Sequence, residues 1–197
     1  MLYRIEKTDI HKAASILGRS FINYPIFTYI IPDNKYRKEK ISLLFSFLIR
    51  NGLQTGEVLA PSKYIEGVSI WIPQNGKSPK VNVIASGIIG LFLRLDNSSL
   101  QRFIKVGREK ERMRLKIINK PYCLLDVIGV DPQFQRKGFA RRMLQPKLNE
   151  LDSKKIPCYM ETSDIANIPM YETYGFTIIN KYMLFETEVF CMLKDIL

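Results

Sequence analysis

The sequence of 197 residues contains one histidine, His11, and three cysteines, Cys123, Cys158 and Cys191. A single histidine excludes a histidine-rich metal site and disfavours a Ser-His or Cys-His catalytic pair, so we expect no metal and a structural role for His11. The cysteines are odd in number and each lies within an apolar run. They therefore argue against a disulfide framework and predict buried free thiols in a reducing, cytoplasmic compartment.

The chain also lacks a long apolar run and any internal repeat, low-complexity tract or linker. Its most membrane-like segment, residues 83–93, is about half the length that a membrane-spanning helix requires. The first residues alternate polar and apolar side chains, unlike the apolar centre of a secretory signal. We therefore expect no transmembrane segment, and a single domain over residues 1–197.

Positive charge dominates, with 30 lysines and arginines against 19 acidic residues and a formal net charge of +11. A field of this sign concentrates anions, which leaves open polyphosphate small molecules, nucleic acids or a simply solvated basic surface. The interleaved aromatic and basic residues of known nucleic-acid-binding modules are not evident, so we expect no nucleic-acid partner. A monomer and a homodimer both remain compatible with the sequence.

Hydrophobic periodicity predicts a mixed α+β fold. Strands are expected at residues 2–6, 56–60, 67–73, 122–130, 157–163, 176–184 and 188–193. Helices are expected from residue 8 or 9 to 22, at 26–31, from 34 to a stop at Gly52, twice within 79–119, and at 138–151 and 168–173. In the strand at 67–73, alternation places Val68, Ile70 and Ile72 on one face and Trp71 on the other.

The segment "VDPQFQRKGFARR", residues 130–142, joins an apolar strand to a helix. Gly138 allows a ligand to approach the main chain closely, and the first amides of a helix have no intrahelical acceptor and lie at the positive end of its dipole. The segment lacks both the P-loop and the dinucleotide-binding patterns. An ordinary strand-to-helix turn is the alternative to a pyrophosphate cradle, which would use the backbone of Gln135, Arg136, Lys137, Gly138, Phe139 and Ala140.

The longer stretch "VIGVDPQFQRKGFARRML" resembles the signature of the GNAT superfamily of acyl-CoA-dependent N-acyltransferases. That signature is an apolar strand ending in Val-x-Pro, then Gln/Arg-x-x-Gly-x-Gly/Ala at the start of a helix. A second stretch, "ETSDIANIPMYETYGF", resembles the family's next strand, its Asn-containing loop and Tyr-x-x-x-Gly-Phe, and Pro146 fits a Leu-x-Pro-x-Leu variant. The resemblance implies a GNAT-like fold: one central mixed, largely antiparallel sheet, splayed between its fourth and fifth strands and flanked by helices. Residues 79–119 form a helical insertion that matches nothing in the family.

The resemblance also implies acetyl-CoA as co-substrate, bound between the splayed strands along the main chain of Ile128, Gly129 and Val130. The amide of Val130 would stabilise charge on the thioester carbonyl. Asn167 would contact the pantetheine arm, with a helix cap as its alternative role. Tyr171 would donate a proton to the departing sulfur, with simple packing as the alternative.

Three candidates remain for the general base: Asp126, Glu161 or a water molecule. Strand alternation, in the absence of a bulge, places Asp126 on the face of Leu124, Ile128 and Val130. Partial desolvation there would raise the pKa of its carboxyl towards that of a useful base.

We thus expect an N-acetyltransferase that moves an acetyl group from acetyl-CoA to a primary amine by direct attack in a ternary complex. No covalent step through a cysteine is required. A non-catalytic acyl-CoA-binding or regulatory module is the alternative. The acceptor is a small-molecule or peptide amine, and its pocket is expected among the N-terminal helices, the insertion and the final strands, where Tyr24, Phe27, Tyr29 and Trp71 are candidates for pocket or core.

Overall fold

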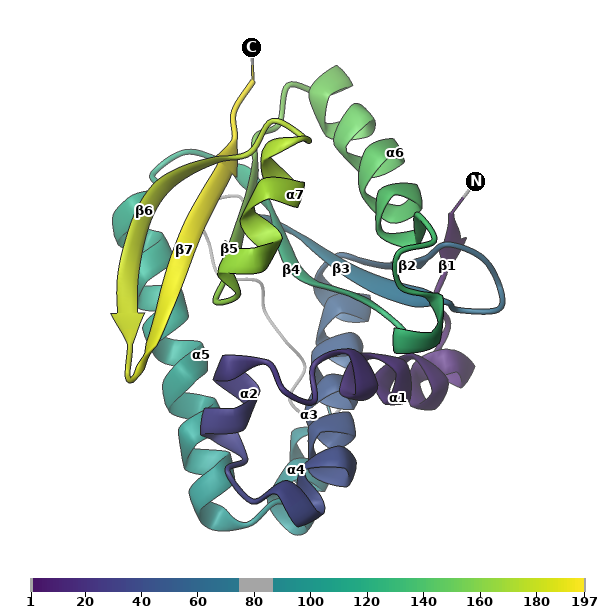
Figure 1. The fold of residues 1–197 in the computed structure, drawn as a ribbon, viewed down its shortest axis with the longest axis vertical. Helices are drawn as coiled ribbons and strands as arrows, with labels where there is room; N and C mark the ends of the chain where they lie inside the picture. The colour runs from purple at the N-terminus through teal and green to yellow at the C-terminus, as the bar shows by residue number, and fades with distance from the viewer. Residues whose placement is uncertain (1, 75–86, 197) are drawn as a thin grey trace.

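The computed structural model describes residues 2–74 and 87–196. Figure 1 shows a single sheet with helices on both of its faces. The strands are β1 Tyr3–Arg4, β2 Glu57–Ala60, β3 Gly67–Gln74, β4 Tyr122–Val130, β5 Cys158–Thr162, β6 Thr177–Leu184 and β7 Thr187–Lys194. The α-helices are α1 Ile10–Ser20, α2 Pro25–Ile30, α3 Asn34–Thr55, α4 Ile88–Arg94, α5 Asn97–Ile117, α6 Phe139–Ser153 and α7 Ile168–Glu172, with short 3-10 turns at Lys7–Asp9, Pro132–Phe134 and Ile165–Asn167.

The sheet has the strand order β1-β2-β3-β4-β5-β7-β6. All neighbouring strands are antiparallel except β4 and β5, which run parallel. Their pairing covers only Cys123–Leu125 against Cys158–Met160. Beyond it the two strands separate towards the end of the molecule where α2 lies (Figure 1). The predicted sheet, mixed, largely antiparallel and splayed between its fourth and fifth strands, is confirmed.

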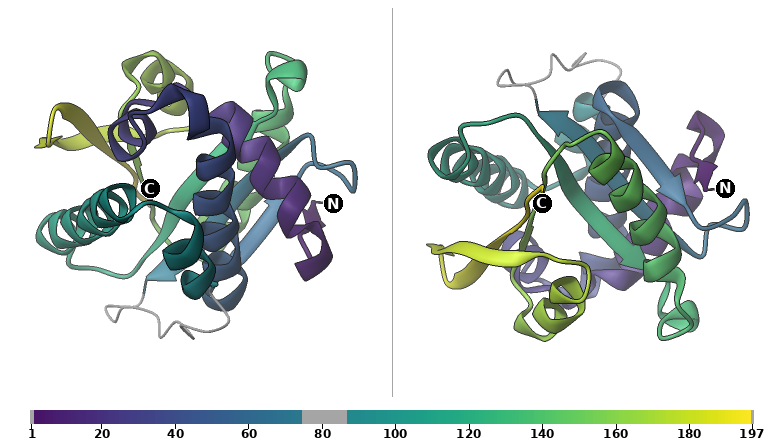
Figure 2. Two further views of the ribbon diagram at one scale, coloured as in Figure 1. Left: turned by 90° about the horizontal axis from the view of Figure 1, so that it is seen from below. Right: turned by 90° about the horizontal axis from the view of Figure 1, so that it is seen from above.

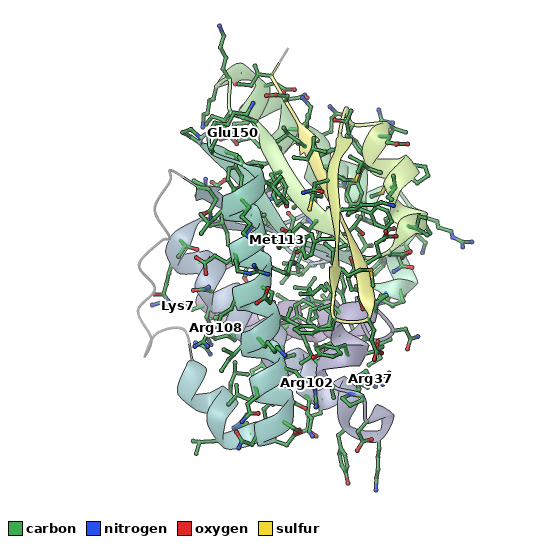
Figure 3. All side chains as sticks on the ribbon, turned by 90° about the vertical axis from the view of Figure 1, so that its left-hand side faces the viewer. Lys7, Arg37, Arg102, Arg108, Met113 and Glu150 are labelled. Carbon is green, nitrogen blue, oxygen red and sulfur yellow. The ribbon has the colours of Figure 1, made fainter. Side chains whose placement is uncertain are left out.

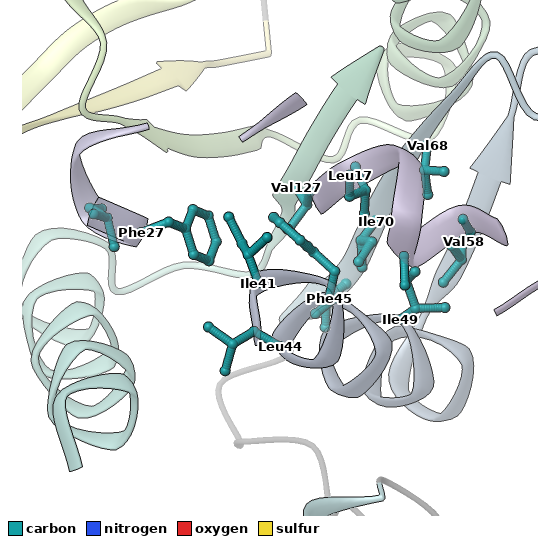
Figure 4. Packing of buried hydrophobic residues seen from close by; sticks show 14 of the residues in the cluster. Leu17, Phe27, Ile41, Leu44, Phe45, Ile49, Val58, Val68, Ile70 and Val127 are labelled. Carbon is teal, nitrogen blue, oxygen red and sulfur yellow. The ribbon is translucent and has the colours of Figure 1, made fainter. Parts of the chain in front are cut away.

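Each face of the sheet has its own hydrophobic core. α1 and α3 pack on one face, where Leu17, Phe45, Ile70 and Val127 belong to one buried cluster (Figure 4). α6 and α7 cover the other face, around Trp71 (Figure 2). Val68, Ile70 and Ile72 share the first cluster while Trp71 is in the second, which confirms the predicted alternation of β3.

The predicted stop of the third helix at Gly52 is wrong, because α3 continues to Thr55. Gly52 lies where the helix presses on the sheet. A Cβ at this position would lie 2.6 Å from Ile70 Cγ2 and 3.0 Å from Val58 Cγ2. The glycine therefore serves close helix–sheet packing, and the helix ends at Thr55 with Gly56 as its C-cap, whose amide donates to the Gly52 carbonyl.

The prediction that Asp126 shares one face with Leu124, Ile128 and Val130 is also wrong, because β4 contains the bulge that it assumed absent. Ile70 pairs with Val127 and Trp71 pairs with Leu125, so Asp126 is an extra residue without a partner on β3. One extra residue reverses the alternation of every later side chain. Leu124 and Val127 consequently face the first core, whereas Ile128 packs against the second.

The predicted helical insertion is present as α4 and α5; its residues 79–86 lie outside the described part. Asp96 begins α5 as its N-cap, accepting from the amide of Ser99, and a hydrogen bond from Lys40 lowers the pKa of its carboxyl. α5 packs against α2, α4 and β6 rather than flat on the sheet, as the side view of Figure 3 shows. Within the described residues, none of the helices is long and apolar enough to cross a bilayer.

Candidate functional site

A cavity of about 780 Å³ passes through the gap between β4 and β5. Its lining includes Met160 and Tyr171 from the core on one face of the sheet. It also includes Phe27 and Leu124 from the core on the other face. Cavities of this size are typical ligand sites, and the walls of this one come from both faces of the sheet.

The bulge of β4 decides which backbone groups face the gap. The Cys123 amide donates to the Pro157 carbonyl on the β5 side, whereas the Asp131 amide donates to the Glu66 carbonyl on the β3 side. Residues eight apart in a regular strand would point the same way; the extra residue between them reverses the direction. The backbone groups of Ile128 and Val130 therefore point away from β3, along the part of β4 that no longer pairs with β5.

The loop after β4 is shaped as a donor surface. Gly138 has φ +80° and stands at the N-cap position of α6, and Arg136 also has a positive φ of 61°. Among the residues that the structure describes, the backbone amides of residues 136–141 have no protein acceptor. Space around Gly138 is open, since a Cβ there would meet nothing within 4 Å. The side chains of Arg136 and Lys137 are exposed and add positive charge.

α1 holds the start of this loop. Ser20 Oγ donates to the Val130 carbonyl at 2.7 Å, and Arg19 donates to the carboxylate of the buried Asp131. Gln135 Nε2 also donates to the Val130 carbonyl, at 3.2 Å. The loop is thereby fixed by side chains while its amides stay open.

Tyr171 lies on α7 with 5% of its surface exposed and lines the cavity. Burial raises the pKa of its phenol well above the ordinary value, without a contribution from a side-chain hydrogen bond. Asn167, just before α7, also lines the cavity. Its side chain does not cap α7. Instead, the side-chain amide nitrogen of Asn167 donates to the Asp164 carboxylate at 3.2 Å.

Tyr24 ties the α1–α2 connection to the end of β5. Its hydroxyl accepts from the Ser163 amide at 2.7 Å and shares a hydrogen bond of 3.1 Å with Thr162 Oγ1. Tyr24 and Phe27 line the cavity. Of the other two pocket candidates, Tyr29 stacks on Phe185 and Trp71 is buried in the second core, donating to Ser69.

The two candidate carboxylates both line the cavity but differ in their contacts. The side chain of Glu161 is 2% exposed; its Oε1 accepts from Tyr159 at 2.9 Å. Its Oε2 accepts no hydrogen bond from the described residues but lies 3.2 Å from Lys110 Nζ and 3.9 Å from the Arg114 guanidinium. Asp126 is half-buried and makes no ion pair or hydrogen bond with the described residues. Burial alone would lower the pKa of Arg114, but the fields of Glu161 and Asp126 raise it.

The three cysteines are free and buried, as predicted. Burial raises the pKa of the Cys123 and Cys191 thiols to about 11 and that of Cys158 well above its ordinary value. Thiols held neutral in this way are poor nucleophiles. His11 is exposed on α1.

Sequence patterns missed the groups that reach the site from distant parts of the chain. Arg19 and Ser20 carry no local signal for a loop more than a hundred residues later. Lys110 and Arg114, one helical turn apart, look like solvated charges in an amphipathic helix. Only the packing of α5 against β6 brings them to Glu161.

Comparisons with known proteins show a sequence relative and a shared fold. No protein-family model matches the chain. A Schizosaccharomyces pombe protein named as an uncharacterized N-acetyltransferase is 27% identical over 180 residues, which cover 88% of this chain and 72% of that protein.

Solved structures share the fold. One described as histone acetyltransferase HPA2 and related acetyltransferase, from Corynebacterium glutamicum, has a TM-score of 0.70 at 16% identity and covers 100% of this chain and 96% of its own. Arylalkylamine N-acetyltransferase 2 from Aedes aegypti has a TM-score of 0.62 at 13% identity, covering 100% and 99%. The likeness extends over the whole fold, including the sheet that carries the cavity.

Proposed function

We propose that this chain, an acetyltransferase of the GNAT superfamily as its two motifs predict, moves the acetyl group of acetyl-CoA to a primary amine in a ternary complex. The observation that carries the proposal is the combination of three features: a row of open amides at the start of α6, an unpaired edge of β4, and a buried tyrosine beside the gap. Together they match the separate parts of a long, phosphate-bearing acyl donor.

The pyrophosphate of coenzyme A fits the start of α6. Six consecutive amides, those of residues 136–141, have no acceptor among the described residues and lie at the positive end of a 15-residue helix. Gly138 leaves the main chain uncovered, and Arg136 and Lys137 supply positive charge. Asn167 lines the cavity from the other side of the gap, which supports its proposed contact with the pantetheine arm.

When bound, acetyl-CoA supplies a thioester, which an amine can attack directly. The amides of Ile128 and Val130 both point into the gap, and Ile128 lines the cavity together with Tyr171. We therefore assign the thioester carbonyl to the Ile128 amide, two residues before the Val130 amide that the family resemblance suggested. A donor fixed in this direction stabilises negative charge as it develops on the carbonyl oxygen.

Tyr171 serves as the general acid. Its raised pKa keeps the phenol protonated at any ordinary pH, and no side-chain hydrogen bond of its hydroxyl contributes to that rise. A proton donated by this hydroxyl to the departing sulfur lets coenzyme A leave as a thiol. Transfer through an acyl-cysteine is disfavoured because the thiols are buried and protonated.

Asp126 is the better candidate for the base. Glu161 Oε1 already accepts from Tyr159, and the charge of the carboxylate is compensated by Lys110 and Arg114, which weakens its attraction for an incoming ammonium. Asp126 lines the same cavity without such contacts. It can accept the proton from the amine either directly or through a water molecule.

Two measurements test the proposal. Isothermal titration with acetyl-CoA should show binding with one site per chain, and a thiol-release assay over a panel of amines should show turnover. Binding without turnover of any amine would favour the non-catalytic acyl-CoA-binding module. Absence of binding would remove the acetyltransferase proposal altogether.

A further inference from the structure

The part of the cavity away from the gap is apolar. Its walls come from α2, α3 and α5, and Phe47 of α3 meets Phe103 of α5 edge to face at a centroid distance of 5.7 Å. Ile30, Leu48 and Ile104 continue the same surface. Protein interiors are normally packed to the density of organic crystals, so apolar walls around an open space of this size fit an apolar guest.

The charged groups of the cavity come mostly from the sheet, as Asp126 and Glu161, and from the second half of α5, as Arg108, Lys110, Glu111 and Arg114. Glu161 is compensated by Lys110 and Arg114, while Asp126 forms no ion pair with the described residues. An ammonium group entering the cavity is therefore drawn towards Asp126. The rest of the same molecule then has to lie against α3 and α5.

We infer that the acceptor is a primary amine on a compact apolar body, such as an aromatic ring or a branched aliphatic chain. The inference rests on the proposed function and names the substrate class of that site. A polyamine would place further ammonium groups among phenylalanine side chains, and a peptide would place unsatisfied amide groups there. Lys110 and Arg114 would also repel additional positive charges.

The test compares four amines: 2-phenylethylamine, isopentylamine, spermidine and a lysine-containing peptide. Burying an aromatic ring or a branched chain favours the first two in kcat/KM by about 30-fold or more over spermidine and the peptide. A preference for spermidine or for the peptide would overturn the inference. In that case acetyl transfer itself, and thus the proposed function, would still stand.

Variants locate the preference in the apolar wall. Phe103→Gln should lower kcat/KM for 2-phenylethylamine by about tenfold or more while leaving the affinity for acetyl-CoA unchanged. Leu93→Gln, at an exposed apolar position on α4, is the matched control and should change neither. Should Phe103→Gln fail to fold, Phe47→Gln takes its place, since it faces the same space. Unchanged kcat/KM in the folded variant would remove this wall from the acceptor site.

Titration of each amine into the protein saturated with CoA measures acceptor binding separately from turnover. If no amine releases thiol in the assay with acetyl-CoA, the proposed function fails. Tighter binding of 2-phenylethylamine than of spermidine would still support the apolar acceptor site. Tighter binding of spermidine would overturn it.

Discussion

The guanidinium of Arg19, near the end of α1, donates a hydrogen bond to the carboxylate of Asp131, 112 positions later in the chain. Asp131 directly follows β4, and its other oxygen accepts from the Gln133 amide. Burial alone would raise the pKa of Asp131, but the hydrogen bonds from Arg19 and Gln133 lower it. The contact therefore fixes the end of β4 from which the loop leading to α6 departs.

Asp131→Asn should make stability less dependent on pH. The folded state lowers the pKa of Asp131, so its carboxylate stabilises the protein at pH values above the ordinary pKa near 4. This contribution is lost as the pH falls through the pKa that Asp131 has in the folded protein. Urea unfolding at pH 7 should show a loss of about 1–2 kcal/mol in the variant. The difference between the two proteins should shrink towards pH 3. A difference that stays constant with pH would contradict this role.

Gly138→Val should abolish measurable binding of acetyl-CoA. The side chain would project into the open space in front of the amides of residues 136–141, and φ +80° disfavours a β-branched residue. Gly175→Val is the matched control, since Gly175 has φ +86° and a Cβ there meets only the Lys194 side chain, at 3.7 Å. Both variants should lose stability in thermal unfolding. Calorimetric titration should show that only the change at Gly138 removes coenzyme binding.

Much of the fold could be predicted from local pattern. Period-two alternation located β3 and oriented its side chains, and the run of β4, apolar except for Asp126, is typical of a strand buried on both faces. Gly52 misled the prediction because a glycine before the end of a helical pattern resembles a helix stop. Its actual role depends on Ile70 and Val58, which lie on strands that follow the helix in the sequence.

The site was predictable only where its chemistry is local. The loop around Gly138 follows from glycine, helix polarity and charge, all within a few residues. The bulge at Asp126 is different, because it is set by pairing with β3, more than fifty residues earlier in the chain. That single extra residue decides that Ile128 and Val130, rather than Val127 and Gly129, face the gap. The apolar wall of the cavity depends likewise on where α5 packs.

Tyr171→Phe should lower turnover by about one to two orders of magnitude with little change in acetyl-CoA affinity. The ring and its packing against Phe176 remain, so only the proton donor is removed. Since the pKa of Tyr171 is raised, the variant should show the loss equally at neutral and at moderately alkaline pH. Steady-state thiol release between pH 7 and 10 measures this. Unchanged turnover would exclude Tyr171 from proton transfer.

Asp126→Asn and Glu161→Gln should separate a base from a structural carboxylate. Asp126→Asn should reduce kcat by about 100-fold at neutral pH, and by less near pH 10, where the amine is increasingly deprotonated in solution. Glu161→Gln leaves Lys110 and Arg114 without their shared anion, so it should lower the melting temperature, because α5 loses its ion pairs to β5.

The pH profile distinguishes the loss of a base from weaker packing. A rising pH compensates for a missing base, because the amine loses its proton in solution, but it does not compensate for weaker packing. Glu161→Gln should keep the wild-type dependence of kcat on pH, whereas Asp126→Asn should regain activity as the pH rises. If Glu161→Gln shows the alkaline recovery and Asp126→Asn does not, the base is Glu161. If neither variant does, a water molecule held by other groups accepts the proton, and the direct role given to Asp126 is wrong.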